Sequence, residues 1–292
     1  MKINKIHSLL FLLGISIFIS NCSDSLSDTT DGRLRYWIST LSSDEFEGRA
    51  PGTEGGQLTK NFISKTFQDF DLDPVDGSYF LDVPASEITL KDSSYLTLSF
   101  RGNDRKMITG DEVVFWTKQA RDYRKIRDSE VVFVGYGIVA PEYNWNDYEG
   151  VDVKGKTVVI LINDPGFATG KLKLFNGRSM TYYGRWTYKF EEAARQGAAA
   201  AIIVHEEEPA AYPWSVVENS WQGPQLDLQR DDLGADRVIL EGWIKDNILN
   251  DVLNFTGFDY DSLRQIALEK TFSAFPLRGL TLSSEIHNKV RY

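Results

Sequence analysis

The sequence is poor in the residues that most often build disulfides and metal sites. Its 292 residues include one cysteine, Cys22, and three histidines, His7, His205 and His287. A lone thiol cannot form an internal disulfide, so the fold must rest on its apolar core. A stripe of basic residues is also lacking: 32 basic and 42 acidic side chains give a net charge of −10. Such a chain repels phosphate backbones, and we expect no nucleic-acid partner.

The N-terminus is typical of an export signal. Lys2 and Lys5 precede an apolar run at residues 9–19 that is too short to span a bilayer. The run ends at Cys22 in the sequence ISNC, which resembles a bacterial lipobox in which the cysteine is lipidated. Asn21 departs from the small residue usual before that cysteine. An ordinary secretory signal with an incidental cysteine is the alternative.

Apolar periodicity predicts helices at both ends of the remaining chain, with strands and one further helix between them. Helical spacing covers residues 34–41, 58–70, 186–196 and 248–267, and Gly197 suits the position just after a helix. Alternating or continuous apolar runs predict strands at residues 95–100, 131–138, 157–162 and 198–204. The content of 42% hydrophobic residues is enough for a large core in one or two domains.

Several long motifs resemble one enzyme family. Residues 43–56 (SDEFEGRAPGTEGG) resemble the opening motif of zinc-dependent aminopeptidases of the family-28 metallopeptidase group. Residues 131–143 (VVFVGYGIVAPEY), 150–156 (GVDVKGK), 163–167 and 180–197 resemble the protease-associated (PA) domain inserted in those enzymes. The similarity extends over nearly all of residues 35–275.

The resemblance implies an α/β fold, with amphipathic helices of an incomplete zinc-exopeptidase domain and a β-rich α/β PA domain. The domains expected from it are a lipoprotein-type signal (1–22), a tether (23–30), an N-terminal helical segment of the peptidase domain (31–85), a PA-like domain (86–241) and a helical return segment with a tail (242–292).

The family hydrolyses peptides at a two-zinc site whose ligands follow the PA insertion. Two histidines outside the signal cannot supply that pattern. We therefore expect no catalytic residue, metal ligand or cofactor in this chain, and zinc only in the parent family. The chain is interpreted as the N-terminal and PA portion of a secreted zinc aminopeptidase, inactive alone and completed by a separate catalytic half. A stand-alone PA-type binding module is the alternative, and an unrelated hydrolase using carboxylates is the least favoured.

Expected partners are a peptide or protein substrate and, through a lipid anchor, a membrane. The expected location is the bacterial cell envelope, lipid-anchored or secreted. Candidate residues of a substrate-cleft wall are Arg49, Tyr182, Tyr183, Arg185 and Trp186, for which core packing and recognition are both open. For Arg185, the alternative to binding a substrate is an internal ion pair with Glu191 or Glu192.

The two histidines outside the signal are interpreted as structural. His205, beside Glu206, Glu207 and Glu208, is taken as the end of a strand next to a solvated acidic turn rather than as a metal ligand. His287 is assigned to a polar tail.

Overall fold

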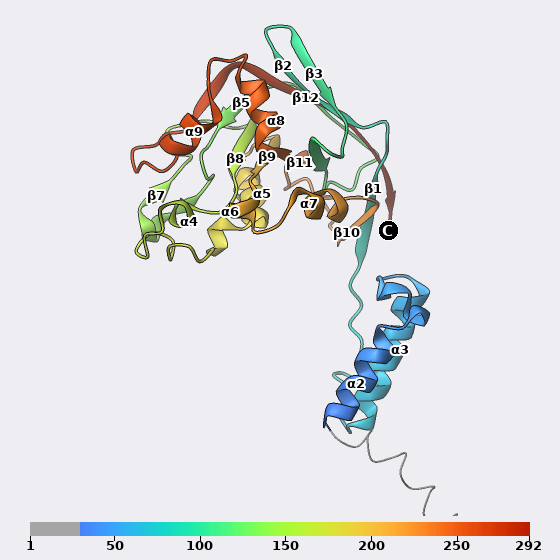
Figure 1. Ribbon diagram of the computed structural model, residues 1–292. Helices are drawn as coiled ribbons and strands as arrows, with labels where there is room; N and C mark the ends of the chain where they lie inside the picture. Colours follow the sequence, from blue (N-terminus) through green and yellow to red (C-terminus); the bar gives the residue numbers. More distant parts are fainter. Residues whose placement is uncertain (1–29) are drawn as a thin grey trace, which may run out of the picture. The chain divides into compact units, whose positions relative to one another are not determined.

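A computed structural model describes residues 30–292. The predicted signal, the lipidation site Cys22 and the tether up to residue 29 lie outside the described residues. The chain divides into two units, one ending at Asp82 and one comprising Val83–Tyr292. Helices and strands mix along the chain, which confirms the α/β fold class (Figure 1).

The first unit is helical. It contains α2 (Thr30–Leu41), the 3-10 helix η1 (Asp44–Arg49) and α3 (Glu54–Asp69). The Thr53 hydroxyl caps α3 by accepting a hydrogen bond from the Gly56 amide at 3.1 Å. Gly55 allows the start of α3 to approach η1, because a Cβ there would lie 2.0 Å from the Phe46 carbonyl oxygen.

The second unit is built on one large mixed sheet. Along its main path the strand order is β10-β1-β12-β5-β8-β9-β11-β4, and β2 and β3 extend from β12. The pairs β5–β8, β8–β9 and β9–β11 are parallel, and the other pairs in this sheet are antiparallel. Parallel pairing needs a long crossover connection: α-helices lie in the connections from β8 to β9 and from β9 to β11, whereas residues 134–156 join β5 to β8 without an α-helix.

The strands of this unit have the following bounds: β1 (Ala85–Leu90), β2 (Tyr95–Phe100), β3 (Asn103–Met107), β4 (Val113–Trp116), β5 (Tyr123–Phe133), β6 (Val139–Ala140), β7 (Trp145–Asn146), β8 (Thr157–Leu161), β9 (Ala200–His205), β10 (Pro224–Leu228), β11 (Leu240–Lys245) and β12 (Phe275–Arg291). The helices are η2 (Pro141–Tyr143), α4 (Pro165–Thr169), η3 (Tyr182–Gly184), α5 (Trp186–Arg195), α6 (Glu207–Ala210), α7 (Trp214–Ser220), α8 (Asp246–Leu253) and α9 (Tyr260–Ile266).

Apolar side chains cover both faces of the central strands. Val131 and Phe133 belong to one buried cluster, and Val132 between them belongs to the other. Helices α8 and α9 pack on the first cluster, for example through Leu249, while α5 and α7 pack on the second, for example through Phe190. Because parallel strands are buried on both sides, these segments are the continuous apolar runs seen in the sequence.

The predicted tail at the C-terminus is wrong. Residues 275–291 form β12, which lies inside the sheet and pairs with β1, β2 and β5. Leu280, Leu282 and Ile286 point into the core in a strand-like alternation, while His287 lies on the partly exposed face. This alternation was present in the sequence. The boundary expected at residue 241 also falls within β11.

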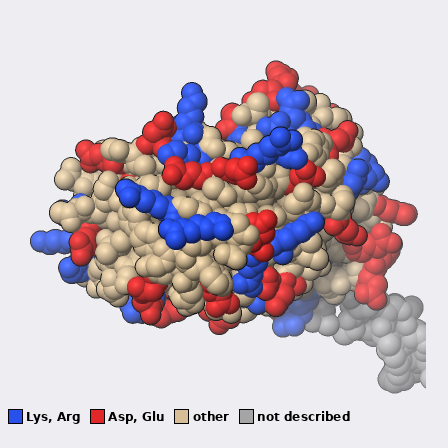
Figure 2. Space-filling view, turned by 90° about the horizontal axis from the view of Figure 1, so that it is seen from above, with Lys and Arg blue, Asp and Glu red and all other residues tan. Residues whose placement is uncertain are grey.

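Charges of both signs are interspersed on the face drawn in Figure 2. Lys and Arg side chains there alternate with Asp and Glu, and areas of uncharged residues separate them. A face of this kind produces no extended field of one sign.

Candidate functional site

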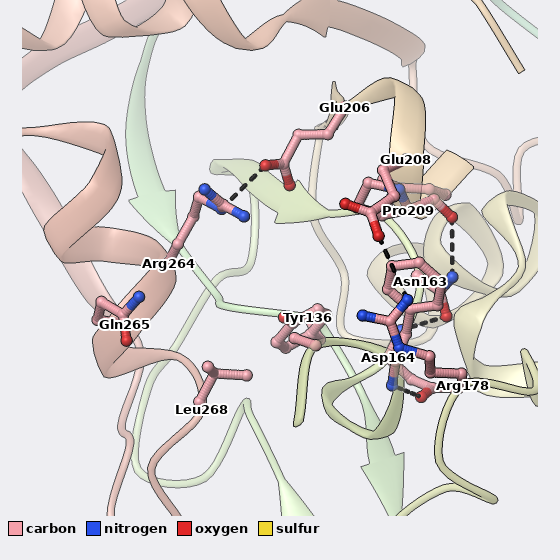
Figure 3. A pocket seen from close by; sticks show the side chains of 13 residues that line it. Tyr136, Asn163, Asp164, Arg178, Glu206, Glu208, Pro209, Arg264, Gln265 and Leu268 are labelled. Atoms are coloured by element: carbon pink, nitrogen blue, oxygen red, sulfur yellow. Dashed lines mark hydrogen bonds and ion pairs between the residues drawn. The ribbon is translucent and has the colours of Figure 1, made fainter. Parts of the chain in front are cut away.

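A cleft of about 290 Å³ opens at the carboxyl ends of three parallel strands (Figure 3). Tyr136 follows β5, Asn163 and Asp164 follow β8, and Glu206 follows β9; α9 contributes Arg264 from the opposite side. Loops beyond the carboxyl ends of parallel strands converge, which is why ligands of open α/β sheets usually bind there.

Asp164 forms the rigid floor of this cleft. Its carboxylate is fully buried and accepts hydrogen bonds from the amides of Gly166 and Phe167 at 3.1 and 3.3 Å, which caps α4. It also accepts from the amide and the hydroxyl of Thr181 at 3.1 and 2.7 Å. With four donors already satisfied, Asp164 positions the loops around the cleft rather than acting on a ligand.

Asn163 joins two of the loops that line the cleft. Its side-chain amide donates to the Pro209 carbonyl at 2.8 Å, and its side-chain oxygen accepts from the Asp164 amide at 2.9 Å. The backbone at Asn163 has φ +69°, a left-handed conformation that asparagine tolerates better than most residues. The end of β8 is therefore fixed to the segment that follows β9.

Two ion pairs stand on either side of the opening. Arg264 Nε lies 2.9 Å from Glu206 Oε1, and Arg178 lies 3.4 Å from Glu208 Oε1 (Figure 3). The Glu206 side chain is only 13% exposed, whereas Arg178 and Glu208 are 69% and 74% exposed. Burial raises the pKa of Glu206, and the Arg264 guanidinium opposes that shift. The first pair is thus fixed and the second is free to rearrange in solvent.

Tyr136 lines the same cleft and is buried. Burial raises the pKa of its phenol well above the ordinary value, so the hydroxyl remains a donor at neutral pH. Its carbonyl oxygen accepts a hydrogen bond from Lys189 Nζ at 2.6 Å. Lys189 and the nearby Asp147 are both buried, and burial lowers the pKa of the lysine and raises that of the aspartate.

The predicted wall residues are distributed differently from the expectation. Tyr182 is exposed and donates to Glu191 at 2.8 Å, and Tyr183 donates to Glu142 at 2.6 Å. Arg185 is exposed at the start of α5, and its side chain makes no hydrogen bond or ion pair within residues 30–292, so the internal partners considered for its guanidinium are not used. None of these three lines the cleft.

Trp186 lines a second pocket, with Trp116 and Trp221. Arg49 belongs to the helical unit, where its guanidinium donates to the Leu41 carbonyl oxygen and its backbone has φ +64°. The aromatic-rich segment at residues 180–198 is therefore partly core, since Tyr188 and Phe190 are buried, and partly surface.

The residues that line the cleft were missed by the sequence interpretation. Arg178 and Arg264 carry no local motif, and Glu206 was assigned to a solvated turn. The usable signal was positional, because polar residues directly follow the buried runs at residues 157–162 and 198–204, which became β8 and β9.

The two described histidines have structural surroundings. His205 is buried, its Nε2 lies 3.1 Å from the Tyr212 carbonyl oxygen, and desolvation lowers its pKa. His287 on β12 lies beside Tyr123, with ring centroids 4.9 Å apart. Among residues 30–292, no three or more His, Cys, Asp or Glu side chains form a group that could hold a metal ion. No helix in that part of the chain is long and apolar enough to cross a membrane.

Comparisons with known proteins give a distant structural relation. No family model and no curated protein matches the chain. Two similar solved structures are an aminopeptidase from Aneurinibacillus sp. strain AM-1 (18% identity, TM-score 0.38) and BSAP, a zinc aminopeptidase from Bacillus subtilis (18% identity, TM-score 0.28). The matches cover 85% and 87% of this chain but 44% and 41% of those proteins, so the chain spans less than half their length.

Proposed function

We propose that the chain is the N-terminal and PA portion of a secreted zinc-dependent aminopeptidase, and that its sheet unit binds the end of a peptide. The motifs at residues 43–56 and 131–156 support the family. The observation that carries the binding role is the cleft at the ends of β5, β8 and β9, flanked by the pairs Arg264–Glu206 and Arg178–Glu208.

A peptide end suits this arrangement of charges. Its carboxylate can accept paired hydrogen bonds from a guanidinium, and its ammonium can donate to a glutamate. Arg264 is 43% exposed although its Nε contacts Glu206 and its Nη1 lies 3.5 Å from Asp261 Oδ1, so part of its donor edge faces solvent. Leu268 and Phe167 add apolar surface for a neighbouring side chain of the peptide.

The binding role is tested by titrating the purified chain with a tripeptide, its N-acetylated form and its C-terminal amide, by calorimetry. If the site recognises the carboxylate, we expect the C-terminal amide to bind most weakly. If it recognises the ammonium, we expect the N-acetylated form to bind most weakly. Charge-assisted hydrogen bonds contribute about 1.5–3 kcal/mol, so Arg264→Gln should raise the Kd for the tripeptide by about 10- to 100-fold. Arg278→Gln, an exposed arginine on β12 outside the cleft, is the matched control. Equal affinity for all three peptides and both variants would contradict the proposal.

Hydrolysis is proposed to require a separate catalytic half, because the sequence outside the signal offers only His205 and His287 as imidazole ligands. In an aminoacyl reporter assay with added zinc, we expect no turnover by the chain alone. Chelator-sensitive turnover by a clean preparation would overturn this part, whatever the peptide titration shows.

The second candidate is a stand-alone PA-type module that binds peptides or proteins without hydrolysis. It is favoured by one feature: the cleft is lined entirely by residues of the Val83–Tyr292 unit. Sequencing the DNA beyond the codon of Tyr292 separates the two. A following reading frame rich in His and Asp supports the aminopeptidase, and an intergenic gap supports the module.

The proposed location is the bacterial cell envelope, anchored by lipid at Cys22. The support is the basic start, the apolar run and the single cysteine of the first 22 residues. We expect Cys22→Ser to move the protein from the membrane fraction to the soluble fraction. A wild-type protein without lipid mass, accompanied by a variant that stays membrane-bound, would refute it.

A further inference from the structure

A second pocket of about 200 Å³ lies elsewhere in the sheet unit. It is formed by the end of β4, the start of α5, the segment after α7 and strand β10. It has no lining residue in common with the peptide cleft, which lies beyond β5, β8 and β9. The two pockets can therefore be altered independently.

Three tryptophans give this pocket its shape. The rings of Trp116 and Trp221 are stacked, with centroids 3.4 Å apart and planes at 6°. Trp186 stands across Trp221 at 89°, with centroids 5.5 Å apart. Trp116 is buried, whereas Trp186 and Trp221 are half-buried. The indoles thus meet at a corner, and the half-buried Trp186 and Trp221 give the pocket apolar surface.

A hydrogen bond and aromatic contacts fix the positions of the indoles in this corner. Trp116 Nε1 donates to the buried carboxylate of Glu241 on β11 at 2.9 Å. Phe190 contacts Trp116 edge-on, with centroids 5.5 Å apart, and Trp186 at 6.1 Å. Rings fixed in this way lose little conformational freedom when a ligand stacks on them.

The polar residues of the lining supply hydrogen-bond donors and acceptors, and their one positive and one negative charge balance. Lys118 Nζ and Asp227 Oδ2 lie 3.8 Å apart, and their side chains are 25% and 22% exposed. Gln225 donates from its amide to the Ser220 carbonyl oxygen at 3.2 Å, while its side-chain oxygen makes no hydrogen bond within residues 30–292. The pocket therefore combines an ammonium, a carboxylate and an amide oxygen beside the indoles.

These features favour a neutral ligand that has one apolar face and a rim of hydroxyls. A pyranose ring has both, since its axial C–H groups stack on indole while its hydroxyls bond to carboxylate, amide and ammonium. A quaternary ammonium ligand is less favourable, because Lys118 in the lining would repel its positive charge. The neighbouring Asp227 is already paired with that lysine. We propose that the tryptophan pocket of Trp116, Trp186 and Trp221 binds one hexopyranose unit of a neutral saccharide.

The proposal is tested on the full chain by recording indole N–H resonances and tryptophan fluorescence. The probes are maltotriose, cellotriose and the trimer of N-acetylglucosamine, with choline chloride as the cationic comparison. We expect at least one saccharide to shift the Trp186 and Trp221 indole signals saturably, and choline to leave them unchanged. Choline binding more tightly than every saccharide, or no shift with any saccharide up to its solubility limit, would overturn the proposal.

Two variants locate the binding. Asp227→Asn should weaken saccharide binding at least tenfold, whereas Asp231→Asn, an exposed acid outside the pocket, should not change it. Trp221→Ala should abolish binding, but it removes a stacking partner of Trp116, so its fold is checked by circular dichroism. Saccharide affinity that is equal in wild type and Asp227→Asn would place any binding outside this pocket and refute the assignment.

Discussion

The two units of the chain use similar apolar patterns to very different effect. In the sheet unit, Val131, Val132 and Phe133 are all fully buried. In the helical unit at residues 30–82, α2 has no buried residue, and Phe46 is the buried large apolar side chain. Ile38 at 65% and Phe70 at 45% are exposed there. Apolar periodicity predicts a helix, but it does not guarantee a second layer that covers the helix.

The difference follows from the number of layers in each unit. A sheet with helices on both faces buries every residue of its central strands. Two helices in contact can bury only the stripe between them, here through pairs such as Tyr36–Phe62 and Trp37–Phe70, with centroids 6.1 and 5.8 Å apart. The helical unit by itself therefore gains much less from burial than the sheet unit.

Limited proteolysis should show the difference between the two units most clearly. The helical unit offers trypsin the exposed sites Arg49, Lys60 and Lys65, and its weak burial favours local opening. We expect trypsin to cut the chain first at these sites and to leave a resistant fragment that starts at Thr66, because no Lys or Arg lies between Lys65 and Lys91. Mass spectrometry of the fragments over time identifies the order.

The same experiment has a clear contrary outcome. Equal resistance of the segment from Asp31 to Phe70 would mean that its apolar side chains are covered in solution. The contrast between a well-buried sheet unit and a poorly buried helical unit would then fail.

A matched pair of phenylalanine substitutions measures the same contrast as free energy. Phe133 on β5 is fully buried, and Phe67 on α3 is 40% exposed. Phe133→Ala should lower the free energy of unfolding by about 3–5 kcal/mol. Phe67→Ala should lower it by less than about 1 kcal/mol, because exposed positions seldom contribute more. Urea titration of both variants is the measurement, and similar losses would contradict the contrast.

Local order was predictable from sequence wherever apolar residues made an unambiguous pattern. Strand β8 at residues 157–161 and helix α5, which ends before Gly197, lie within the predicted segments, whereas β5 overlaps its predicted segment only at residues 131–133. The C-terminal strand β12 was missed although it alternates, because its hydrophilic residues were taken as a tail. Its pairing with strands about 150 to 200 positions earlier has no local signature.

The pockets were less predictable than the strands. Tyr136, Asp164, Glu206 and Arg264 meet only because β5, β8 and β9 are neighbours in the sheet. Strand order depends on long-range pairing, which a single sequence does not specify. Trp186 was one of the predicted wall residues, but it lines a pocket other than the cleft, and its partners Trp116 and Trp221 lie 70 and 35 positions away in the chain.

Glu241 shows that burial in the sheet unit has an electrostatic cost that is absent from a solvated surface. Its carboxyl group is 1% exposed, and burial raises its pKa from 4.5 to about 7. The folded state then holds a proton that the unfolded state releases above its own lower pKa. Stability should therefore fall as pH rises from 4.5 to 7, by on the order of 3 kcal/mol for this group.

Glu241→Gln isolates that contribution, because the amide oxygen can still accept the hydrogen bond from Trp116 Nε1. We expect the variant and the wild type to have similar unfolding free energies near pH 4.5, and the variant to be the more stable above pH 7. Urea titrations across this range give the difference, with the exposed Glu269→Gln as the control that should show no such trend. A constant difference between wild type and Glu241→Gln at every pH would mean that the buried carboxyl group does not titrate in this window. The charge would then be compensated within the sheet unit, and burial there would carry no electrostatic cost.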